Sequence, residues 1–150
     1  MSGIILRGKR VDNGEWVEGH TVLISSSDAD GAYIISSGTE FDMLVDEYGN
    51  IGEMQGIILR IIPETLGQYS GLNDKNGKKI FDGDILKIYE GSEDNGYKIC
   101  ELYSYRGVLC VDYETSEWDF NALAFLDSDN VFSFEVIGNI HDNPDLLEVR

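Results

Sequence analysis

Two aspartates on either side of a glycine are the residues of this sequence best arranged for acid–base chemistry. Asp82 and Asp84 are separated by Gly83 alone. Glycoside hydrolases use a pair of carboxyl groups in catalysis. That chemistry requires one carboxyl group with a raised pKa, which residue types alone do not indicate. Aspartates beside a glycine also form tight turns, because their side chains accept hydrogen bonds from turn amides. We favour the turn, and a hydrolase that uses Asp82 and Asp84 is the alternative.

Residues that could bind a metal ion or act as nucleophiles are sparse. The two histidines, His20 and His141, and the two cysteines, Cys100 and Cys110, do not have the spacing of a zinc site. The sequence has no Gly-x-Ser-x-Gly elbow and no glycine-rich phosphate loop. Both cysteines lie in apolar, strand-like segments, which favours reduced, half-buried side chains. We therefore expect no catalysis, no cofactor and no structural metal.

The charge of the chain is strongly negative. The 28 acidic and 11 basic residues give a formal net charge of −17, which disfavours binding to nucleic-acid phosphates and to anionic membranes. Between Arg106 and Arg150 the sequence contains ten acidic residues and no lysine or arginine. This segment could attract a basic partner, or it could simply keep the surface soluble. The candidate interaction surface within it consists of Asp112, Glu114, Glu117 and Asp119.

Segments typical of secretion or membrane insertion are not found. No N-terminal stretch combines a basic flank with the apolar core of a signal peptide. The longest apolar runs, such as residues 57–59 and 61–62, are far too short to span a bilayer. We therefore expect a soluble, cytoplasmic protein that does not associate with membranes.

Short strands joined by tight turns are predicted along most of the chain, because it has seventeen glycines and two prolines. Asn13-Gly14 predicts a hairpin between residues 4–11 and 16–24, since both central residues of such a turn adopt positive φ. Asp74-Lys75-Asn76-Gly77 predicts a second hairpin-type turn, and Gly83 predicts a bulge or sharp bend. Further strands are predicted at residues 32–35, 56–62, 97–104, 107–114, 122–126 and 131–140.

The C-terminal segment predicts a single helical turn. Pro144-Asp145-Leu146-Leu147 has proline at the first helical position, and Asn143 precedes it as a cap. Residues 36–56 give no clear pattern. The regular spacing of short strands and turns predicts a mainly β protein, and 150 residues can bury a core without a disulfide. One continuous β-barrel or sandwich that uses all the strands is an open alternative.

Two segments of the chain resemble one protein family. Residues 67–85 read GQYSGLNDKNGKKIFDGDI, and residues 136–147 read VIGNIHDNPDLL. Both are similar to signatures of the YopX-like proteins of phages and prophages in Gram-positive bacteria. The opening residues 6–17 also resemble a common start of that family. The C-terminal signature is the more specific, with an eight-residue match from Val136 to Asn143.

The resemblance implies a fold without implying a chemistry. The family is similar in fold to SH3-type barrels, so we expect an SH3-like barrel with a C-terminal tail in residues 66–150. A β subdomain of residues 1–65 is expected to pack on it as one compact unit. The family has no established catalytic residues to transfer. Its signature residues, whose role is unknown, correspond here to Gln68, Tyr69, Gly71, Asp74, Gly83, Asp84, Gly138 and Asn139.

The function expected from these observations is that of a non-catalytic protein-interaction module. We expect a phage- or prophage-encoded protein in the cytoplasm of the bacterial host, with an acidic surface that binds a basic host or phage protein. In a sharper form of this hypothesis the acids imitate DNA phosphates and block a DNA-binding protein. The rival hypothesis is a self-assembling structural protein whose exposed strand edges pair into a homo-oligomer.

Overall fold

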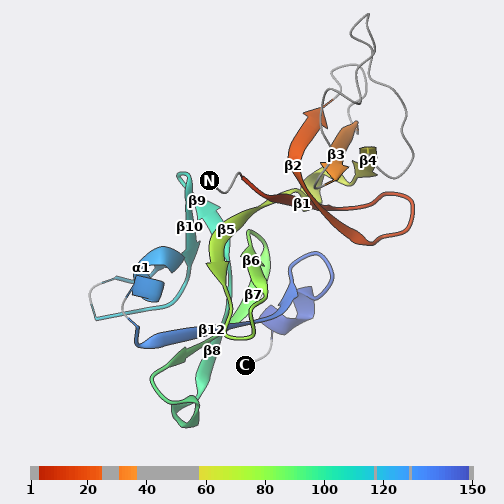
Figure 1. Cartoon of the computed structure of the whole chain (residues 1–150). Coiled ribbons are helices and arrows are strands. Elements are labelled where there is room, and N and C mark those ends of the chain that lie inside the picture. Colours follow the sequence, from red (N-terminus) through yellow and green to blue (C-terminus); the bar gives the residue numbers. More distant parts are fainter. Residues whose placement is uncertain (1–3, 25–30, 37–57, 117, 129, 149–150) are drawn as a thin grey trace, which may run out of the picture. The chain divides into compact units, whose positions relative to one another are not determined.

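The computed structural model describes residues 4–24, 31–36, 58–116, 118–128 and 130–148 (Figure 1). The chain forms two compact units, residues 1–68 and 69–150, which we call the N-terminal and C-terminal units. The described part of the chain consists mainly of antiparallel strands with one short α-helix, which confirms the predicted mainly β fold. No helix in these residues is long and apolar enough to cross a membrane.

The N-terminal unit is an antiparallel sheet in the order β4-β3-β2-β1, with the first residues of β5 paired to β1. The predicted hairpin at Asn13-Gly14 joins β1 and β2, and Gly14 has a φ of +72° in its turn. β3 and β4 confirm two further predicted strands, and β4 ends shortly before Pro63. The strand bounds are β1 (Leu6–Lys9), β2 (Trp16–Ile24), β3 (Ala32–Ser36) and β4 (Ile58–Ile61).

The core of the N-terminal unit depends on close contacts between these strands. Ile34 and Ile61 are fully buried and pack with Ala32. A Cβ atom at Gly19 would lie 2.0 Å from the carbonyl oxygen of Ile35. β2 can therefore approach β3 this closely only with glycine at that position. Val17, Val22 and Leu66 are half-buried against this core.

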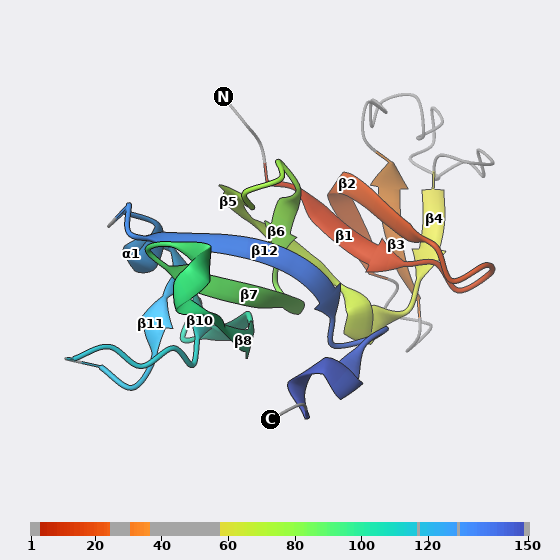
Figure 2. The same ribbon diagram turned by 90° about the horizontal axis from the view of Figure 1, so that it is seen from below.

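The C-terminal unit contains two three-stranded sheets, β12-β7-β8 and β11-β10-β9, and the antiparallel pair β5–β6. β12 lies antiparallel along β7, with a register shift between Val136 and Gly138 (Figure 2). The second predicted hairpin turn lies between β5 and β6, as expected. The strand bounds are β5 (Gly67–Asn73), β6 (Lys79–Phe81), β7 (Asp84–Glu90), β8 (Tyr97–Glu101), β9 (Tyr103–Tyr105), β10 (Val108–Val111), β11 (Asn121–Ala122) and β12 (Phe132–Asn139).

One hydrophobic core joins both three-stranded sheets of the C-terminal unit. Each sheet turns an apolar face toward it, and burial of these side chains is the main favourable term in the stability of such a unit. Leu72, Leu109, Phe132 and Val136 pack against its edge. The buried members are Ile80, Leu86, Ile88, Cys100, Leu102, Val111, Tyr113, Leu123, Leu126 and Phe134.

One strand predicted from the sequence is a helix in the structure. The sequence predicts a strand at residues 122–126, but α1 (Leu123–Ser128) occupies most of this segment. Leu123 and Leu126 are buried in the core, whereas Phe125 is 56% exposed. A spacing of three residues between buried leucines fits the helical period and not the alternation of a strand. The strand prediction was therefore wrong here.

A second predicted strand, residues 97–104, is divided at Leu102. β8 pairs with β7, whereas β9 pairs with β10. Between them Leu102 is fully buried and donates from its backbone nitrogen to the carbonyl oxygen of Asp84 (2.8 Å). The described strands form separate antiparallel sheets and no closed barrel. The SH3-like barrel stays a prediction, as does the boundary between residues 65 and 66.

Candidate functional site

The Asp82-Gly83-Asp84 segment forms a tight turn in which Asp82 is half-buried and Gly83 and Asp84 are buried. Gly83 has a φ of +92°, its nitrogen donates to the carbonyl oxygen of Leu102 (2.9 Å), and its carbonyl accepts from the nitrogen of Ile140 (2.9 Å). Asp84 is 1% exposed, and its Oδ2 accepts from the backbone nitrogen of Phe81 (2.8 Å). The Asp84 carboxylate thus closes the turn between β6 and β7.

Asp74 links the turn after β5 to β12. Its Oδ1 accepts from the nitrogens of Asn76 and Lys78 (both 2.9 Å), and its Oδ2 accepts from the nitrogen of Val136 (2.9 Å). Desolvation by burial raises the pKa of Asp74, but these amide donors and the charge of Lys78 outweigh it and hold the pKa below its usual value. The ionised carboxylate therefore supports the fold.

Gly138 and Asn139 form a similar link at the end of β12. The Oδ1 atom of Asn139 accepts from the nitrogens of His141 (3.0 Å) and Asp142 (2.9 Å). Asn143 was expected to cap the helical turn η4 (Pro144–Leu147), which is present, but its side chain makes no cap hydrogen bond. Its Oδ1 accepts instead from the nitrogen of Asn139 (3.2 Å), and a Cβ at Gly138 would lie 2.6 Å from that oxygen.

The other signature residues lie on β5. Gln68 is exposed and opposite Leu6, and the ring of Tyr69 packs against Phe81 with 5.6 Å between centroids. The Tyr69 hydroxyl donates to the side chain of Asn73 (2.5 Å). Gly71 has a φ of +88° within the irregular pairing of β5 with β6. The signature residues hold turns and strand ends together and do not converge on one pocket.

The predicted acidic surface falls on the loop between β10 and β11, residues 112–120, which we call the acidic loop. Asp112, Glu114 and Asp119 are exposed, whereas Glu117 lies outside the described residues. The Tyr103 hydroxyl donates to Asp112, and this hydrogen bond with burial raises the pKa of Tyr103 to about 12. The structure thus brings the three described acids onto one loop.

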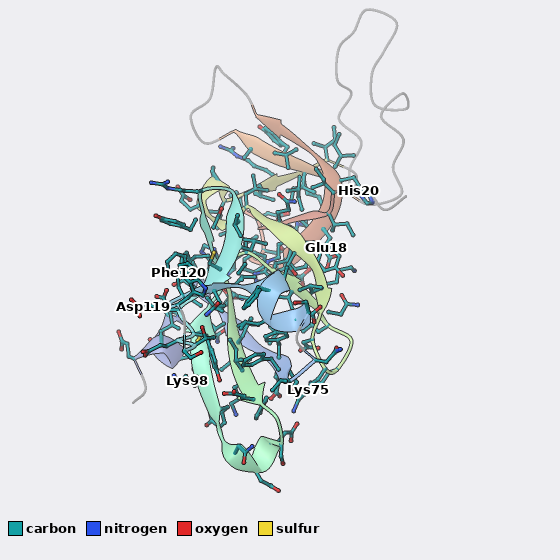
Figure 3. All side chains as sticks on the ribbon, turned by 90° about the vertical axis from the view of Figure 1, so that its left-hand side faces the viewer. Glu18, His20, Lys75, Lys98, Asp119 and Phe120 are labelled. Atoms are coloured by element: carbon teal, nitrogen blue, oxygen red, sulfur yellow. The ribbon has the colours of Figure 1, made fainter. Side chains whose placement is uncertain are left out.

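The acidic loop also carries exposed aromatic side chains. Trp118 is 62% exposed, although its backbone is held in a turn in which Thr115 donates to the carbonyl oxygen of Trp118 (2.8 Å). Asn121 is buried and donates from Nδ2 to the carbonyl oxygen of Tyr113 (2.7 Å). Phe120, next to Asp119, packs edge-on against Tyr105 with 5.4 Å between centroids (Figure 3). Patterns of charge in the sequence indicated the acids but not the tryptophan among them.

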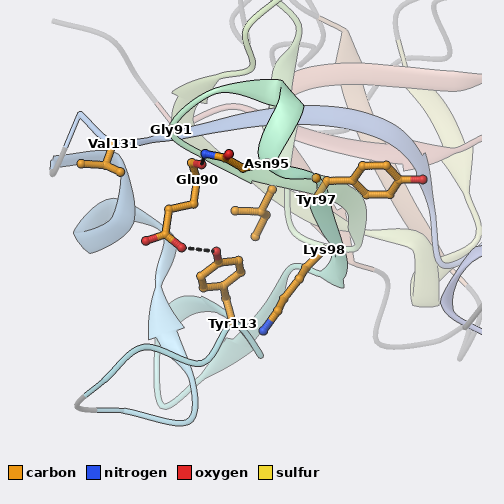
Figure 4. A pocket seen from close by; sticks show the side chains of 9 residues that line it. Glu90, Gly91, Asn95, Tyr97, Lys98, Tyr113 and Val131 are labelled. Atoms are coloured by element: carbon orange, nitrogen blue, oxygen red, sulfur yellow. Dashed lines mark hydrogen bonds between the residues drawn. The ribbon is translucent and has the colours of Figure 1, made fainter.

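A groove of about 550 Å³ opens at the end of the C-terminal core (Figure 4). Ile88 and Tyr113, which are almost fully buried, belong to both the groove and the core. The turn between β7 and β8, with η3 (Glu93–Asn95), forms one wall, and Val131 lies on another. The lining residues are Ile88, Glu90, Gly91, Asn95, Gly96, Tyr97, Lys98, Tyr113 and Val131.

Two opposite charges meet the ring of Tyr113 in this groove. The Tyr113 hydroxyl donates to Oε2 of Glu90 (3.1 Å), and the Nζ atom of Lys98 lies 5.0 Å from the ring centroid. Burial, followed by the hydrogen bond that Tyr113 donates to Glu90, raises the pKa of Tyr113 to about 12. Figure 4 shows Glu90 and Lys98 approaching Tyr113 from different sides. No local pattern in the sequence indicates this groove, because its residues come from three separate segments.

No histidine or cysteine lines the groove, and Cys100 meets the acidic loop only from the core, where its Sγ donates to the carbonyl oxygen of Asp112 (3.8 Å). His20 is exposed on β2 with Nδ1 3.1 Å from the carbonyl oxygen of Ile4, and His141 lies in the turn after β12. Cys100 and Cys110 are both free and buried. Burial raises the pKa of Cys100 to about 11, with Asp112 adding to the effect. A thiol with such a pKa is a poor nucleophile at neutral pH.

Comparison with known proteins relates the chain to one family. The family model described as YopX protein matches residues 6–148. A curated relative, the SPbeta prophage-derived uncharacterized protein YopX of Bacillus subtilis (strain 168), is 32% identical over 74 residues. These residues are 48% of this chain and 52% of the relative, so the chain spans about half the length of the curated relative it matches.

A solved structure has a similar fold. The X-ray crystal structure of protein yopX from Bacillus subtilis matches with a TM-score of 0.57 and 18% sequence identity. The match covers 95% of this chain and 96% of that chain. At this level of identity the similarity bears on the fold alone.

Proposed function

The chain belongs to the YopX protein family, and from this premise we propose that it is a prophage-type, non-catalytic module that binds a basic segment of another protein through its acidic loop. The partner is a host or phage protein in the cytoplasm of the bacterial cell. Residues 112–120 make the contact with the partner, and the rest of the fold holds them in place.

The observation that carries the proposal is the exposed tryptophan in an ordered turn. Trp118 is 62% exposed, yet Thr115 and the buried Asn121 hold the loop around it. Tryptophan is enriched among the residues that dominate binding energy in protein interfaces. An exposed tryptophan side chain contributes little to the stability of the fold. A residue whose backbone is already ordered loses little conformational entropy on binding.

The charge around Trp118 supports a basic partner. Glu114 and Asp119 are exposed on the same loop, and no lysine or arginine lies between Arg106 and Arg150 in the sequence. Such a field accelerates the association of a positively charged protein at low salt. An arginine of the partner could pair with a carboxylate and stack on the indole ring.

The role of Asp84 supports a module without catalysis. Its carboxylate is buried and bound to the backbone of Phe81, which is the environment of a turn-stabilising group. Hydrolysis by Asp82 and Asp84 would require both carboxyl groups to reach a substrate, but the Asp84 carboxylate is buried. We therefore assign both aspartates to the structure of the turn.

We also propose that the C-terminal unit is an open variant of the SH3-like barrel. The chain from β8 to β9 passes through Leu102 and connects the two three-stranded sheets, whose apolar faces share one core. A bend of this kind in one continuous strand is how orthogonally packed sheets are joined.

An affinity experiment tests the binding proposal. The purified chain is used as bait in a lysate of Bacillus subtilis, the organism of the prophage-derived relative, at low and at high salt. We expect basic proteins to be retained at low salt and released at high salt, because the attraction between exposed charges is screened. One variant replaces Trp118 with alanine, and a second carries Asp112→Asn, Glu114→Gln, Glu117→Gln and Asp119→Asn.

A matched variant controls for net charge. Glu64→Gln, Asp94→Asn, Asp127→Asn and Glu148→Gln remove the same number of exposed charges away from the acidic loop. We expect both loop variants to lose the retained proteins and the control to keep them. If all charge variants weaken retention equally, or nothing basic is retained, the acidic loop has no binding role. Concentration-dependent light scattering of the pure chain would favour the rival hypothesis of self-assembly.

A further inference from the structure

We propose that the groove at the open end of the C-terminal core binds a small zwitterion, namely an α-amino acid with an apolar side chain. This inference is independent of the proposed interaction of the acidic loop. It rests on the shape of the groove, on its apolar floor and on the two opposite charges beside Tyr113.

The groove has the size and the floor of a small-molecule site. Its volume of about 550 Å³ lies within the range of natural ligand pockets. Ile88 is 1% exposed and Tyr113 is 6% exposed, so both are fixed by the core beneath them. A Cβ at Gly96 would have no atom within 4 Å, which leaves the wall open at this position.

The two charges of the groove are close to one ring but are not paired with each other. Glu90 is fixed by the Tyr113 hydroxyl (3.1 Å), and the ammonium group of Lys98 lies over the ring of Tyr113. In the part of the chain that the structure describes, neither Glu90 nor Lys98 has an ion-pair partner. By contrast, the described Lys75 pairs with Glu93 and lies near Glu135.

This pair of charges restricts the chemistry of the ligand. A purely cationic ligand would be repelled by Lys98, and a purely anionic ligand would be repelled by Glu90. A wholly apolar ligand would remove both charges from water without compensation. A zwitterion can place its ammonium group at Glu90 and its carboxylate at Lys98, with two charge-assisted hydrogen bonds.

The apolar floor selects among zwitterions. An α-amino acid carries both charges on one carbon atom, so its side chain extends from the charged end of the groove. Val131 is 43% exposed and lines the groove as apolar surface, above the nearly buried Ile88 and Tyr113. A leucine or phenylalanine side chain matches this surface better than a polar one.

Calorimetric titration of the full chain tests the proposal with three related probes. L-Phenylalanine carries both charges, 2-phenylethylamine lacks the carboxylate, and 3-phenylpropanoate lacks the ammonium group. We expect L-phenylalanine to bind in the high micromolar to millimolar range. The amine and the acid should each bind about tenfold or more weakly, because each loses one charge-assisted hydrogen bond.

Variants connect the binding to the two charges. Glu90→Gln keeps an oxygen that can accept from Tyr113, and Lys98→Met keeps the aliphatic part of the side chain. Each is expected to weaken L-phenylalanine binding about tenfold or more. Glu64→Gln and Lys78→Met serve as matched controls on exposed residues outside the groove and should bind normally.

Three results would overturn the proposal. They are the absence of heat with both L-phenylalanine and L-leucine, equal binding of 2-phenylethylamine and L-phenylalanine, and normal binding by Glu90→Gln. A thermal unfolding curve shows whether each variant is folded. If one variant is unfolded, the other variants and the probe series still test the proposal. Trp118→Ala separates the two proposals, since it should lose retention by the acidic loop but keep binding in the groove.

Discussion

The family-signature segments and the segment between them use polar residues in opposite ways. In the signature segments, residues 67–85 and 136–147, the carboxylates of Asp74 and Asp84 are buried and bound to backbone amides. In residues 90–131, by contrast, the charged side chains of Glu90, Lys98, Asp112, Glu114 and Asp119 are exposed. The first set holds the fold together, whereas the second is free to contact another molecule. The most recognisable residues of this chain are therefore not those that we propose for binding.

This comparison predicts that substitutions in the two regions will affect stability very differently. Removing a buried hydrogen-bond acceptor leaves a donor unsatisfied and a space unfilled. Removing an exposed side chain changes stability little. Three substitutions, ordered from the largest expected effect to the smallest, test whether the division holds.

Asp84→Ala should have the largest effect. It leaves the nitrogen of Phe81 without its acceptor in a site where Asp84 was 1% exposed. We expect a loss of about 3 kcal/mol in the free energy of unfolding, measured by urea denaturation. Asp94→Ala, on the exposed turn after β7, is the control and should change it by less than about 0.5 kcal/mol. Equal effects of the two would show that the turn at Asp84 is not structural.

Asp74→Asn should have an intermediate and pH-dependent effect. The amide nitrogen of asparagine cannot accept a hydrogen bond, so the variant cannot bind Val136, Lys78 and Asn76 together. We expect a loss of about 1–2 kcal/mol at neutral pH. Because the folded-state pKa of Asp74 is lowered, its contribution is full above the unfolded value and is lost as the pH falls through the folded-state pKa.

The pH series therefore distinguishes the carboxylate from the rest of the side chain. Urea midpoints measured between about pH 6 and pH 3 should fall less for the variant than for the unchanged chain. The difference between the two curves should shrink toward the acidic end. Parallel curves would contradict an ionised Asp74 as a stabilising group.

Trp118→Ala should have the smallest effect on stability. The side chain is 62% exposed, so its removal should change the free energy of unfolding by less than about 0.5 kcal/mol. The same variant should lose the retention of basic proteins. A loss of more than about 2 kcal/mol would mean that Trp118 belongs to the structure, and the difference between the two regions would then disappear at this residue.

Local signals in the sequence predicted much of the fold because they depend on only a few neighbouring residues. Asn13-Gly14 predicted the β1–β2 hairpin, and Gly83 predicted a bend, since each requires a positive φ that glycine adopts without strain. The prediction failed at residues 122–126, where the buried leucines follow the helical period. An apolar run this short does not distinguish a strand from a turn of helix.

The candidate sites were harder to predict from the sequence than the fold was. The charge pattern of residues 106–150 indicated the acidic loop, because net charge follows from the residue types alone. The turn that fixes Trp118 depends on Thr115 and Asn121, and neither residue type signals binding by itself. The groove requires Glu90, Lys98 and Tyr113 to meet, although the sequence separates them by eight and fifteen residues.

The sequence by itself determined the family, the positions of the tight turns and the acidic character of the chain, because these depend on local residue types and on composition. Only the tertiary structure decided which carboxylates are buried and which are exposed. Asp84 and Asp119 are the same residue type, yet Asp84 is 1% exposed and hydrogen-bonded to the backbone nitrogens of Phe81 and Leu102, whereas Asp119 is exposed on the acidic loop. The reason is that burial depends on packing between distant segments, which no short stretch of sequence specifies.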